Sequence, residues 1–243
     1  MPSPHKDRRR KPSYDTERAV AELAAADQKL GRLIERAGPF TLRLAATQSP
    51  FEALTESIIY QQLHGKAAAT IHRRLLESFS GICGLDGDGD PIHFQPQELL
   101  DCPNEQLRHA GLSHNKALAL RDLAAKTLDG TVPTLAKAKK MSDEALIEHL
   151  SQVRGIGKWT VEMFLMFRLG RPNVLPVDDY GIRKGFALTF LGLKPDAKVT
   201  PDLLAKKEQI MRRAKKWQPW SSVACWYMWR ACDLAAGKVV QPE

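Results

Sequence analysis

Residues 153–164 read VRGIGKWTVEMF and place two glycines, Gly155 and Gly157, directly before an apolar helical run. Upstream, SDEALIEHLSQV has helical periodicity, and Ser142 stands where a helix cap is expected. Glycine lets a short turn take positive φ and lets another backbone come close. The sequence therefore predicts a hairpin of two helices over about residues 142–169, joined by a glycine turn.

The second helix of such a hairpin would present unpaired N–H groups and the positive end of its dipole, which favour an anion such as a phosphate. Lys158 adds positive charge at the same end. An ordinary helix–helix turn has the same glycines, so the turn alone leaves DNA binding and simple packing open.

The chain has 243 residues and a formal net charge of +8, which suggests an anionic partner such as nucleic acid. Half of the excess lies in residues 1–11, where five Lys and Arg stand against one Asp. We expect residues 1–14 to be a disordered basic tail, a solvated leader rather than a segment that contacts phosphates. The chain shows no secretory signal or membrane span, and its four cysteines are typical of thiols in a reducing compartment.

Helical periodicity continues nearly everywhere from Asp15 onward, first to Gly38 and later in a helix capped by Ser113. Convincing strand alternation is absent, so the predicted fold is all-α. The loop GLDGDGDPIHF at 84–94 has alternating aspartates, but Pro91 stands where a calcium loop needs glycine. It is interpreted as a turn.

Four motifs, in order, carry a resemblance to a known family. LSQVRGIGKWTVEMF followed by VLPVDDYGIRKGF resembles the signature of the helix-hairpin-helix (HhH-GPD) DNA glycosylase superfamily: hairpin, Gly/Pro loop and aspartate. SIIYQQLHGKAAATI, AGLSHNKALALRDLA and WQPWSSVACWYMWR are similar to segments of its DNA-3-methyladenine glycosylase II family. The resemblance runs from about residue 16 to 235.

The resemblance implies two helical subdomains with a cleft between them, formed by residues 15–243 without an N-terminal β-domain. It implies a monomeric, monofunctional glycosylase that flips alkylated purines, such as 3-methyladenine or 7-methylguanine, out of double-stranded DNA. The enzyme would hydrolyse the N-glycosidic bond in base excision repair. No membrane partner is expected, and the location would be cytoplasmic and nucleoid-associated in a prokaryote or nuclear in a eukaryote.

Asp179 is the predicted catalytic residue, because it matches the position of the family's aspartate. A carboxylate beside the sugar can stabilise the positive charge of the transition state and orient or deprotonate a water. From the residues alone, Asp178 or Asp179 could simply cap a helix that begins near Tyr180. With the resemblance, Asp179 becomes the catalytic group and Asp178 the expected cap.

A cationic base needs a pocket that attracts positive charge without a counter-ion, and aromatic faces provide one. Trp226 and Trp229, three apart on one helix, are interpreted as core residues. The candidate pocket residues are Trp159 and Trp220, which match aromatic positions of the family, Met163, where a relative has an aromatic ring, and Tyr60.

The gap left by an extruded base must be filled. By resemblance, Leu63 is the wedge; a buried helix-end leucine is the alternative. His64, directly beside it, is a candidate for a contact to the minor groove, with no such contact as the equal alternative. The expected contacts to the DNA backbone are Gly155, Gly157, Lys158 and Arg154, which replaces the hairpin's usual proline.

Members of the superfamily that cut the strand have a lysine nucleophile where this chain has Trp159, and Lys158 lies one residue too early. No AP-lyase activity is therefore expected. The superfamily often holds Na⁺ or K⁺ on hairpin carbonyls, which here belong to Ser151, Val153 and Ile156. No cofactor is required, and no iron–sulfur cluster is expected, because no further cysteines follow Cys225 and Cys232.

Two other functions remain open: a DNA-damage binding protein without catalysis, and a glycosylase for another damaged base. The final motif has Ser221 where the family has arginine, which puts the role of that arginine in doubt here.

Overall fold

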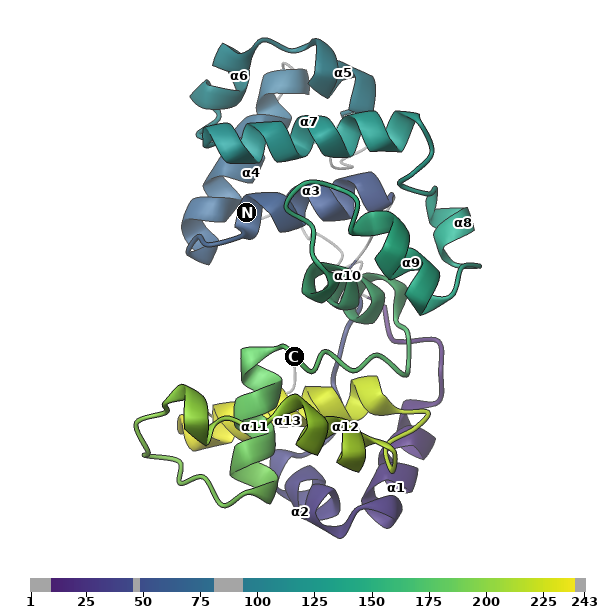
Figure 1. Ribbon diagram of the computed structural model, residues 1–243, viewed down its shortest axis with the longest axis vertical. Coiled ribbons are helices and arrows are strands. Elements are labelled where there is room, and N and C mark those ends of the chain that lie inside the picture. Colours follow the sequence, from purple (N-terminus) through teal and green to yellow (C-terminus); the bar gives the residue numbers. More distant parts are fainter. Residues whose placement is uncertain (1–9, 46–48, 81–93, 239–243) are drawn as a thin grey trace, which may run out of the picture. The chain divides into compact units, whose positions relative to one another are not determined.

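The computed structural model describes residues 10–45, 49–80 and 94–238, and within these ranges the regular elements are helices (Figure 1). Among the described residues the β-pairing is limited to a bridge between Arg10 and Leu44. The all-α prediction is therefore confirmed. None of the described helices is long and apolar enough to cross a membrane. The aspartates of the 84–94 loop lie outside the described residues.

The chain divides into two compact units: unit 1 combines residues 1–46 with residues 165–243, and unit 2 comprises residues 47–164. Two helical subdomains were expected; the cleft between them stays a prediction.

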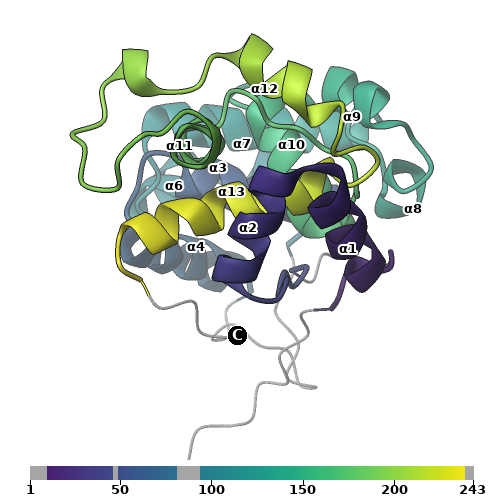
Figure 2. The same ribbon diagram turned by 90° about the horizontal axis from the view of Figure 1, so that it is seen from below.

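Unit 1 is arranged around its last helix, α13, which packs against α2 and α11 (Figures 1 and 2). Trp217 and Tyr227 are among the largest fully buried side chains here. The helices of unit 1 are α1 (Thr16–Ala26), α2 (Gln28–Ala37), the π-helix η1 (Leu165–Leu169), α11 (Tyr180–Phe190), the 3-10 turn η2 (Pro201–Leu203), α12 (Lys207–Ala214) and α13 (Ser221–Ala235).

The helical pattern expected from Asp15 to Gly38 is broken at Asp27, which ends α1 and caps α2. The Asp27 carboxylate is buried and accepts hydrogen bonds from Arg213 Nε at 2.7 Å, Arg213 Nη2 at 2.6 Å and Trp217 Nε1 at 3.2 Å. Burial alone would raise the pKa of Asp27, but the hydrogen bonds from Arg213 and Trp217 outweigh it and lower the pKa. Asp27 thus joins α2 to α12 through a buried ion pair.

The disordered tail was expected to extend to residue 14, but residues 10–14 are ordered. Arg10 exchanges both backbone hydrogen bonds with Leu44, at 3.2 and 2.8 Å, and Pro12 is buried. The ring of Tyr14 packs against Trp220 with centroids 5.7 Å apart, and burial raises the pKa of Tyr14 to about 12. The ordered part of unit 1 therefore includes these five residues, whereas residues 1–9 lie outside the described ranges.

Unit 2 is arranged around α7, which packs against α3 and α5. Ser113 caps α7 and Ser142 caps α9, as predicted, by accepting hydrogen bonds from Lys116 N at 3.4 Å and Ala145 N at 3.2 Å. The helices are α3 (Pro50–Tyr60), α4 (Gly65–Ser80), α5 (Pro96–Asp101), α6 (Asn104–His109), α7 (His114–Leu128), α8 (Leu135–Ala138), α9 (Asp143–Leu150) and α10 (Lys158–Phe164).

The predicted hairpin is confirmed as α9 and α10 joined by the glycine turn. The second helix begins at Lys158, as expected, but changes to π-helical geometry at Leu165 before it ends at Leu169.

Candidate active site

Asp179 stands at the start of α11 with its carboxylate held by two donors. The backbone N–H of Ile182 donates to Oδ1 at 2.8 Å, so Asp179 is the N-cap of the helix. The indole Nε1 of Trp229, on α13, donates to the same oxygen at 2.9 Å. Asp179 is half-buried. A carboxylate fixed in this way has a defined orientation and remains accessible from solvent.

Two glycines on α11 allow α13 to come this close. A Cβ on Gly181 would lie 2.5 Å from Cδ1 and 2.8 Å from Nε1 of Trp229. A Cβ on Gly185 would overlap the backbone of Met228. Because glycine lacks this atom, the two helices approach within backbone contact and the indole reaches Asp179. Gly181 and Gly185 are four residues apart, so they share one helix face.

The neighbouring carboxylate, Asp178, has a different partner. It is exposed and forms an ion pair with Lys207 at the start of α12. The expectation that Asp178 caps the helix is therefore wrong, because Asp179 accepts the capping hydrogen bond itself. The cap and the proposed catalytic group are one side chain.

The tryptophans of α13 are placed differently from the prediction. Trp220, at the helix start, donates to Glu22 Oε2 at 2.6 Å and packs against Tyr14. Trp229 lies nine residues further, about 13 Å along the axis. Trp226 is buried, as interpreted, whereas Trp229 is half-buried and bonded to Asp179. The structure thus places Trp229, and not Trp220, beside the carboxylate, which corrects its interpretation as a core residue.

Sequence reasoning missed Trp229 because its spacing from Trp226 fits a core stripe equally well. A usable signal is the pair Gly181 and Gly185 within YGIRKGF, since small residues at this spacing indicate a close helix–helix approach. The ring of Phe167 on η1 packs against Trp229 with centroids 5.5 Å apart, so the indole has aromatic support.

The glycine turn of unit 2 is fixed from the protein side. Gly155 has a φ of 78°, which disfavours other residues, and its carbonyl accepts from Gln61 Nε2 at 2.8 Å. The N–H of Arg154 donates to Asp122 Oδ2 at 2.7 Å. Burial opposes the charge on Asp122, but hydrogen bonds from Lys126 and from the Arg154 N–H outweigh it and lower the pKa of Asp122. Two partners, Gln61 at the end of α3 and Asp122 in α7, therefore set the turn.

The outward side of the same turn is open. Arg154, Gly157 and Lys158 are exposed, and a Cβ on Gly157 would meet no atom within 4 Å. Gly157 is therefore not required by packing within the protein, and its space is available to a ligand. The Lys158 ammonium lies 3.7 Å from the buried carboxylate of Glu162, so its positive charge is partly neutralised within α10.

The aromatic and apolar candidates of unit 2 lie on α10 and at the end of α3. Trp159 is in the first turn of α10 with 45% of its surface exposed, and Met163, one turn later, is half-buried. Tyr60 ends α3, and its ring meets His72 edge-on with centroids 6.4 Å apart. Burial raises the pKa of Tyr60, so its phenol is protonated near neutral pH.

Leu63 and His64 lie in the short loop between α3 and α4, and both are exposed. The alternative that Leu63 is a buried helix-end residue is therefore wrong. Gln62 has a φ of 58°, an uncommon value for a residue other than glycine. Lys116 of α7 donates to the carbonyls of Ile59 and Gln61, at 2.5 and 2.9 Å, and burial lowers the pKa of Lys116. Lys116 thus holds the backbone before the loop in place, while the side chain of Leu63 is exposed.

The remaining candidates concern metals. Of the predicted carbonyl ligands, Val153 already accepts the N–H of Ile156 at 3.0 Å, which leaves one lone pair on that oxygen, and Ser151 is exposed. The described residues contain no cluster of His, Cys, Asp and Glu suited to a metal ion. Cys232 donates to the Gly181 carbonyl at 3.3 Å, and burial raises the pKa of its thiol.

The predicted site residues therefore form two groups. Unit 1 contains Asp179 and, away from it, Trp220; the structure adds Trp229 as the partner of Asp179. Unit 2 contains the turn, the exposed loop and the predicted pocket residues Trp159, Met163 and Tyr60.

Comparison with known proteins gives consistent matches. A family model described as HhH-GPD superfamily base excision DNA repair protein matches residues 55–219. DNA-3-methyladenine glycosylase 1 of Schizosaccharomyces pombe is 33% identical over 229 residues, which cover 93% of this chain and 92% of that protein. The putative DNA-3-methyladenine glycosylase YfjP of Bacillus subtilis is 31% identical over 78% of this chain and 61% of that protein.

Solved structures agree with these relatives. The Schizosaccharomyces pombe enzyme in complex with abasic DNA matches with a TM-score of 0.67 at 32% identity, covering 87% of this chain and 95% of that one. A DNA-3-methyladenine glycosidase from Bacillus halodurans matches with a TM-score of 0.75 at 31% identity, covering 90% and 91%.

Proposed function

Because the chain belongs to the HhH-GPD superfamily of base excision DNA repair proteins, we propose that it is a monofunctional DNA glycosylase that hydrolyses the N-glycosidic bond of alkylated purines. The observation that carries the proposal is the Asp179 carboxylate, which is fixed by Ile182 N–H and Trp229 Nε1. Its motif, VDDYGIRKGF, resembles the aspartate motif of the family. The names of the relatives support the DNA-3-methyladenine class of substrate.

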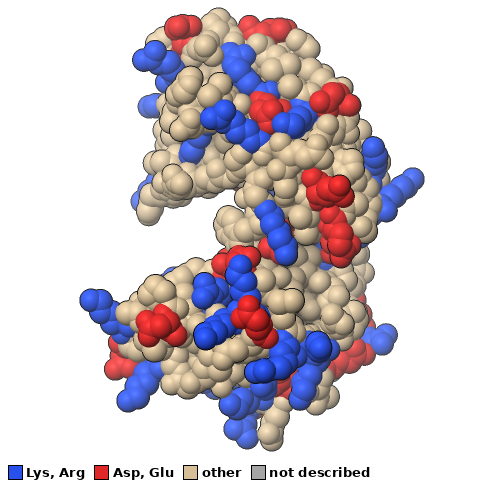
Figure 3. Space-filling view, viewed as in Figure 1, with Lys and Arg blue, Asp and Glu red and all other residues tan. Residues whose placement is uncertain are grey.

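Unit 2 would bind the DNA backbone through the outward side of the glycine turn. Exposed backbone at Gly157, with Arg154 and Lys158 beside it, suits a phosphate that approaches closely and reads no base sequence. On the face shown in Figure 3, Lys and Arg are dispersed over both units with acidic residues among them. The proposed contact with DNA therefore rests on the exposed residues of the glycine turn.

Leu63 would fill the space left in the duplex when the damaged nucleotide swings out. It is 39% exposed, and its loop is supported by Lys116 from α7. An apolar side chain inserted into the base stack requires such rigid support, because unstacking costs on the order of a few kcal/mol. His64, exposed beside Leu63, would contact the minor groove.

An alkylated purine such as 7-methylguanine carries positive charge, so it leaves with the electron pair of the glycosidic bond and needs no added proton. The positive charge then moves to the sugar. Asp179 would stabilise that charge and orient the attacking water, whose proton passes to the carboxylate or to solvent. The aromatic face of Trp159, which is 45% exposed, would attract the cationic base by about 1–2 kcal/mol when desolvated.

The absence of strand cleavage is part of the proposal. The lyase nucleophile of bifunctional relatives would fall at Trp159, and the nearby Lys158 ammonium lies 3.7 Å from Glu162. Borohydride treatment during turnover should therefore trap no covalent enzyme–DNA adduct. A Na⁺ or K⁺ ion on the carbonyls of Ser151, Val153 and Ile156 would add positive charge beside the bound phosphate.

The experiment that tests the function is a base-release panel on duplexes with one lesion each: 3-methyladenine, 7-methylguanine, 1-methyladenine, ethenoadenine or hypoxanthine. We expect the cationic 3-methyladenine and 7-methylguanine to be released fastest. Faster release of a neutral base would assign another specificity, and tight binding without any release would assign a DNA-damage binding protein.

A further inference from the structure

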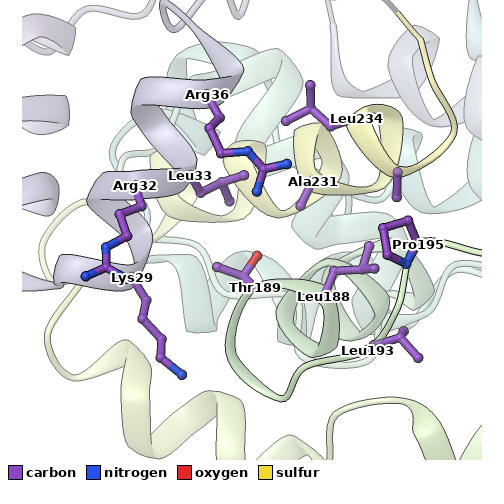
Figure 4. Close-up of a pocket in the computed structure, with 11 residues that line it drawn as sticks. Lys29, Arg32, Leu33, Arg36, Leu188, Thr189, Leu193, Pro195, Ala231 and Leu234 are labelled. Carbon is purple, nitrogen blue, oxygen red and sulfur yellow. The ribbon is translucent and has the colours of Figure 1, made fainter.

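A cavity in unit 1 opens at the other end of α11 from Asp179 (Figure 4). It has a volume of about 380 Å³ and is lined by α2, the end of α11 with the following loop, and the end of α13. Thr189, in its wall, is ten residues from Asp179, or about 15 Å along the helix. The cavity is therefore separate from the proposed catalytic carboxylate, and it is within the size range of ligand sites.

Three cations form one wall of this cavity. Lys29, Arg32 and Arg36 occupy positions i, i+3 and i+7 of α2, so they form a single stripe, and all three are exposed. The residues that line the cavity include no Asp or Glu. Within the described part of the chain neither arginine forms an ion pair, and Lys29 donates to the Phe190 carbonyl at 3.3 Å. Such a stripe attracts an anion.

The floor of the cavity is aliphatic. Leu188, Leu193 and Leu234 line it and are each half-buried, so they retain apolar surface that contacts solvent. Figure 4 shows Arg36 on α2 directed toward Leu234, so a cation lies next to this apolar surface. No aromatic side chain lines the cavity, which leaves nucleobases without a stacking platform. A DNA backbone would use the cations but not the leucines.

We propose that this cavity, with Lys29, Arg32 and Arg36 over Leu188, Leu193 and Leu234, is a docking site for an acidic segment of a partner protein that inserts one aliphatic side chain. The carboxylates pair with the stripe on α2, where charge complementarity fixes register and speeds association. The aliphatic side chain covers the leucines and provides the anchor. The site is independent of catalysis, so its test does not depend on the glycosylase activity.

The probe is a random dodecapeptide display library, selected on the full-length protein and counter-selected on the Arg32→Gln/Arg36→Gln variant. Recovered peptides should combine Asp or Glu with Leu, Ile or Val. A labelled consensus peptide should bind the double variant at least about tenfold more weakly, since two charge-assisted contacts are lost. Leu193→Ser, which leaves the stripe intact, should also weaken binding, and added salt of about 0.5 M should weaken it further.

The matched control is Lys215→Gln/Lys216→Gln, which removes two exposed cations of the same unit outside the cavity and should bind the peptide as the wild type does. A peptide with Lys in place of its acids should bind Arg32→Glu/Arg36→Glu and not the wild type. Thermal unfolding and circular dichroism verify that each variant is folded. The proposal is overturned if no acidic peptide is enriched, if the double variant binds equally well, or if the double variant loses affinity for undamaged duplex DNA instead.

Discussion

The surroundings of Asp179 in unit 1 and the glycine turn of unit 2 are built in opposite ways. At Asp179, two protein donors converge on one carboxylate oxygen, and glycines on α11 bring the indole of Trp229 to it. At the turn, Gln61 and Asp122 hold the inner side, while the backbone at Gly157 faces open space. The first arrangement orients a side chain, and the second presents a backbone surface.

This difference follows from what each region must do. A group that takes part in bond cleavage gains most from being fixed before the substrate arrives, because no reorganisation is then needed in the transition state. A surface that grips phosphates must instead leave its N–H groups and space unoccupied. Mutations in the first region should therefore reduce the rate of base release, and those in the second should reduce affinity for DNA.

The largest effect is expected for Asp179→Asn. Asparagine is also a good N-cap and retains an acceptor for Trp229, so the fold and duplex affinity should persist. Single-turnover base release should fall about 10³-fold, because the charge that stabilises the sugar cation is lost. The control is Asp178→Asn, which removes the adjacent carboxylate and its ion pair with Lys207 but should release base at nearly the wild-type rate. Equal losses for the two variants would contradict the assignment.

A smaller effect is expected for Trp229→Phe, which keeps an aromatic ring against Phe167 but removes the donor to Asp179. A hydrogen bond to a charged group is worth about 1.5–3 kcal/mol, so base release should slow by about 10- to 100-fold with little change in KM. Trp226→Phe, on the same helix and buried, is the control and should change stability more than rate. If both variants slow release alike, Trp229 has only a packing role.

In unit 2, Gly157→Ala should weaken DNA binding about tenfold without a change in Tm. The added methyl group meets no protein atom, but it occupies the space proposed for a phosphate. Gly155→Ala is the contrasting variant: its φ of 78° places strain of about 1–2 kcal/mol on any other residue, so Tm should fall. Titration of a duplex by anisotropy, together with thermal unfolding, separates the two outcomes. Unchanged affinity of Gly157→Ala would remove the phosphate from this position.

The smallest effect on activity is expected for Asp27→Asn, which lies in neither region. Loss of the buried ion pair with Arg213 should reduce the free energy of unfolding by about 3 kcal/mol at neutral pH. The pKa of Asp27 is lower in the folded protein than its ordinary value of 3.8. The Asp27 carboxylate therefore stabilises the fold fully above about pH 3.8, and this stabilisation is lost as the pH falls through the lower pKa of the folded state. Denaturation of the wild type and the variant at several pH values should show that the difference between their free energies of unfolding shrinks in acid. A difference that stays constant would contradict this.

Local sequence was enough for those features that depend on local chemistry. The helices, the caps Ser113 and Ser142, and the glycine turn were predicted and are confirmed, because periodicity, capping side chains and positive φ act within a few residues. The exposed loop at Leu63 was identified by resemblance to a family motif rather than by physical reasoning.

Features that depend on packing between distant segments were not predictable in the same way. Either of two adjacent aspartates can cap a helix, and only the position of Lys207 shows that Asp178 is used elsewhere. The partner of Asp179 depends on the face that α13 presents to α11, 50 residues away. The ordered conformation of residues 10–14 likewise depends on contacts with Leu44 and Trp220. These partners are distant in sequence, so the residues around 10–14 do not predict them.

The central claim is that Trp229 acts on catalysis through Asp179, and a double-mutant cycle on single-turnover base release tests it most directly. The rate is measured for the wild type, Trp229→Phe, Asp179→Asn and the double variant on one duplex with a 7-methylguanine. We predict that Trp229→Phe slows the wild type by about 10- to 100-fold and leaves the residual rate of Asp179→Asn unchanged. The same fractional loss in both backgrounds would contradict the claim.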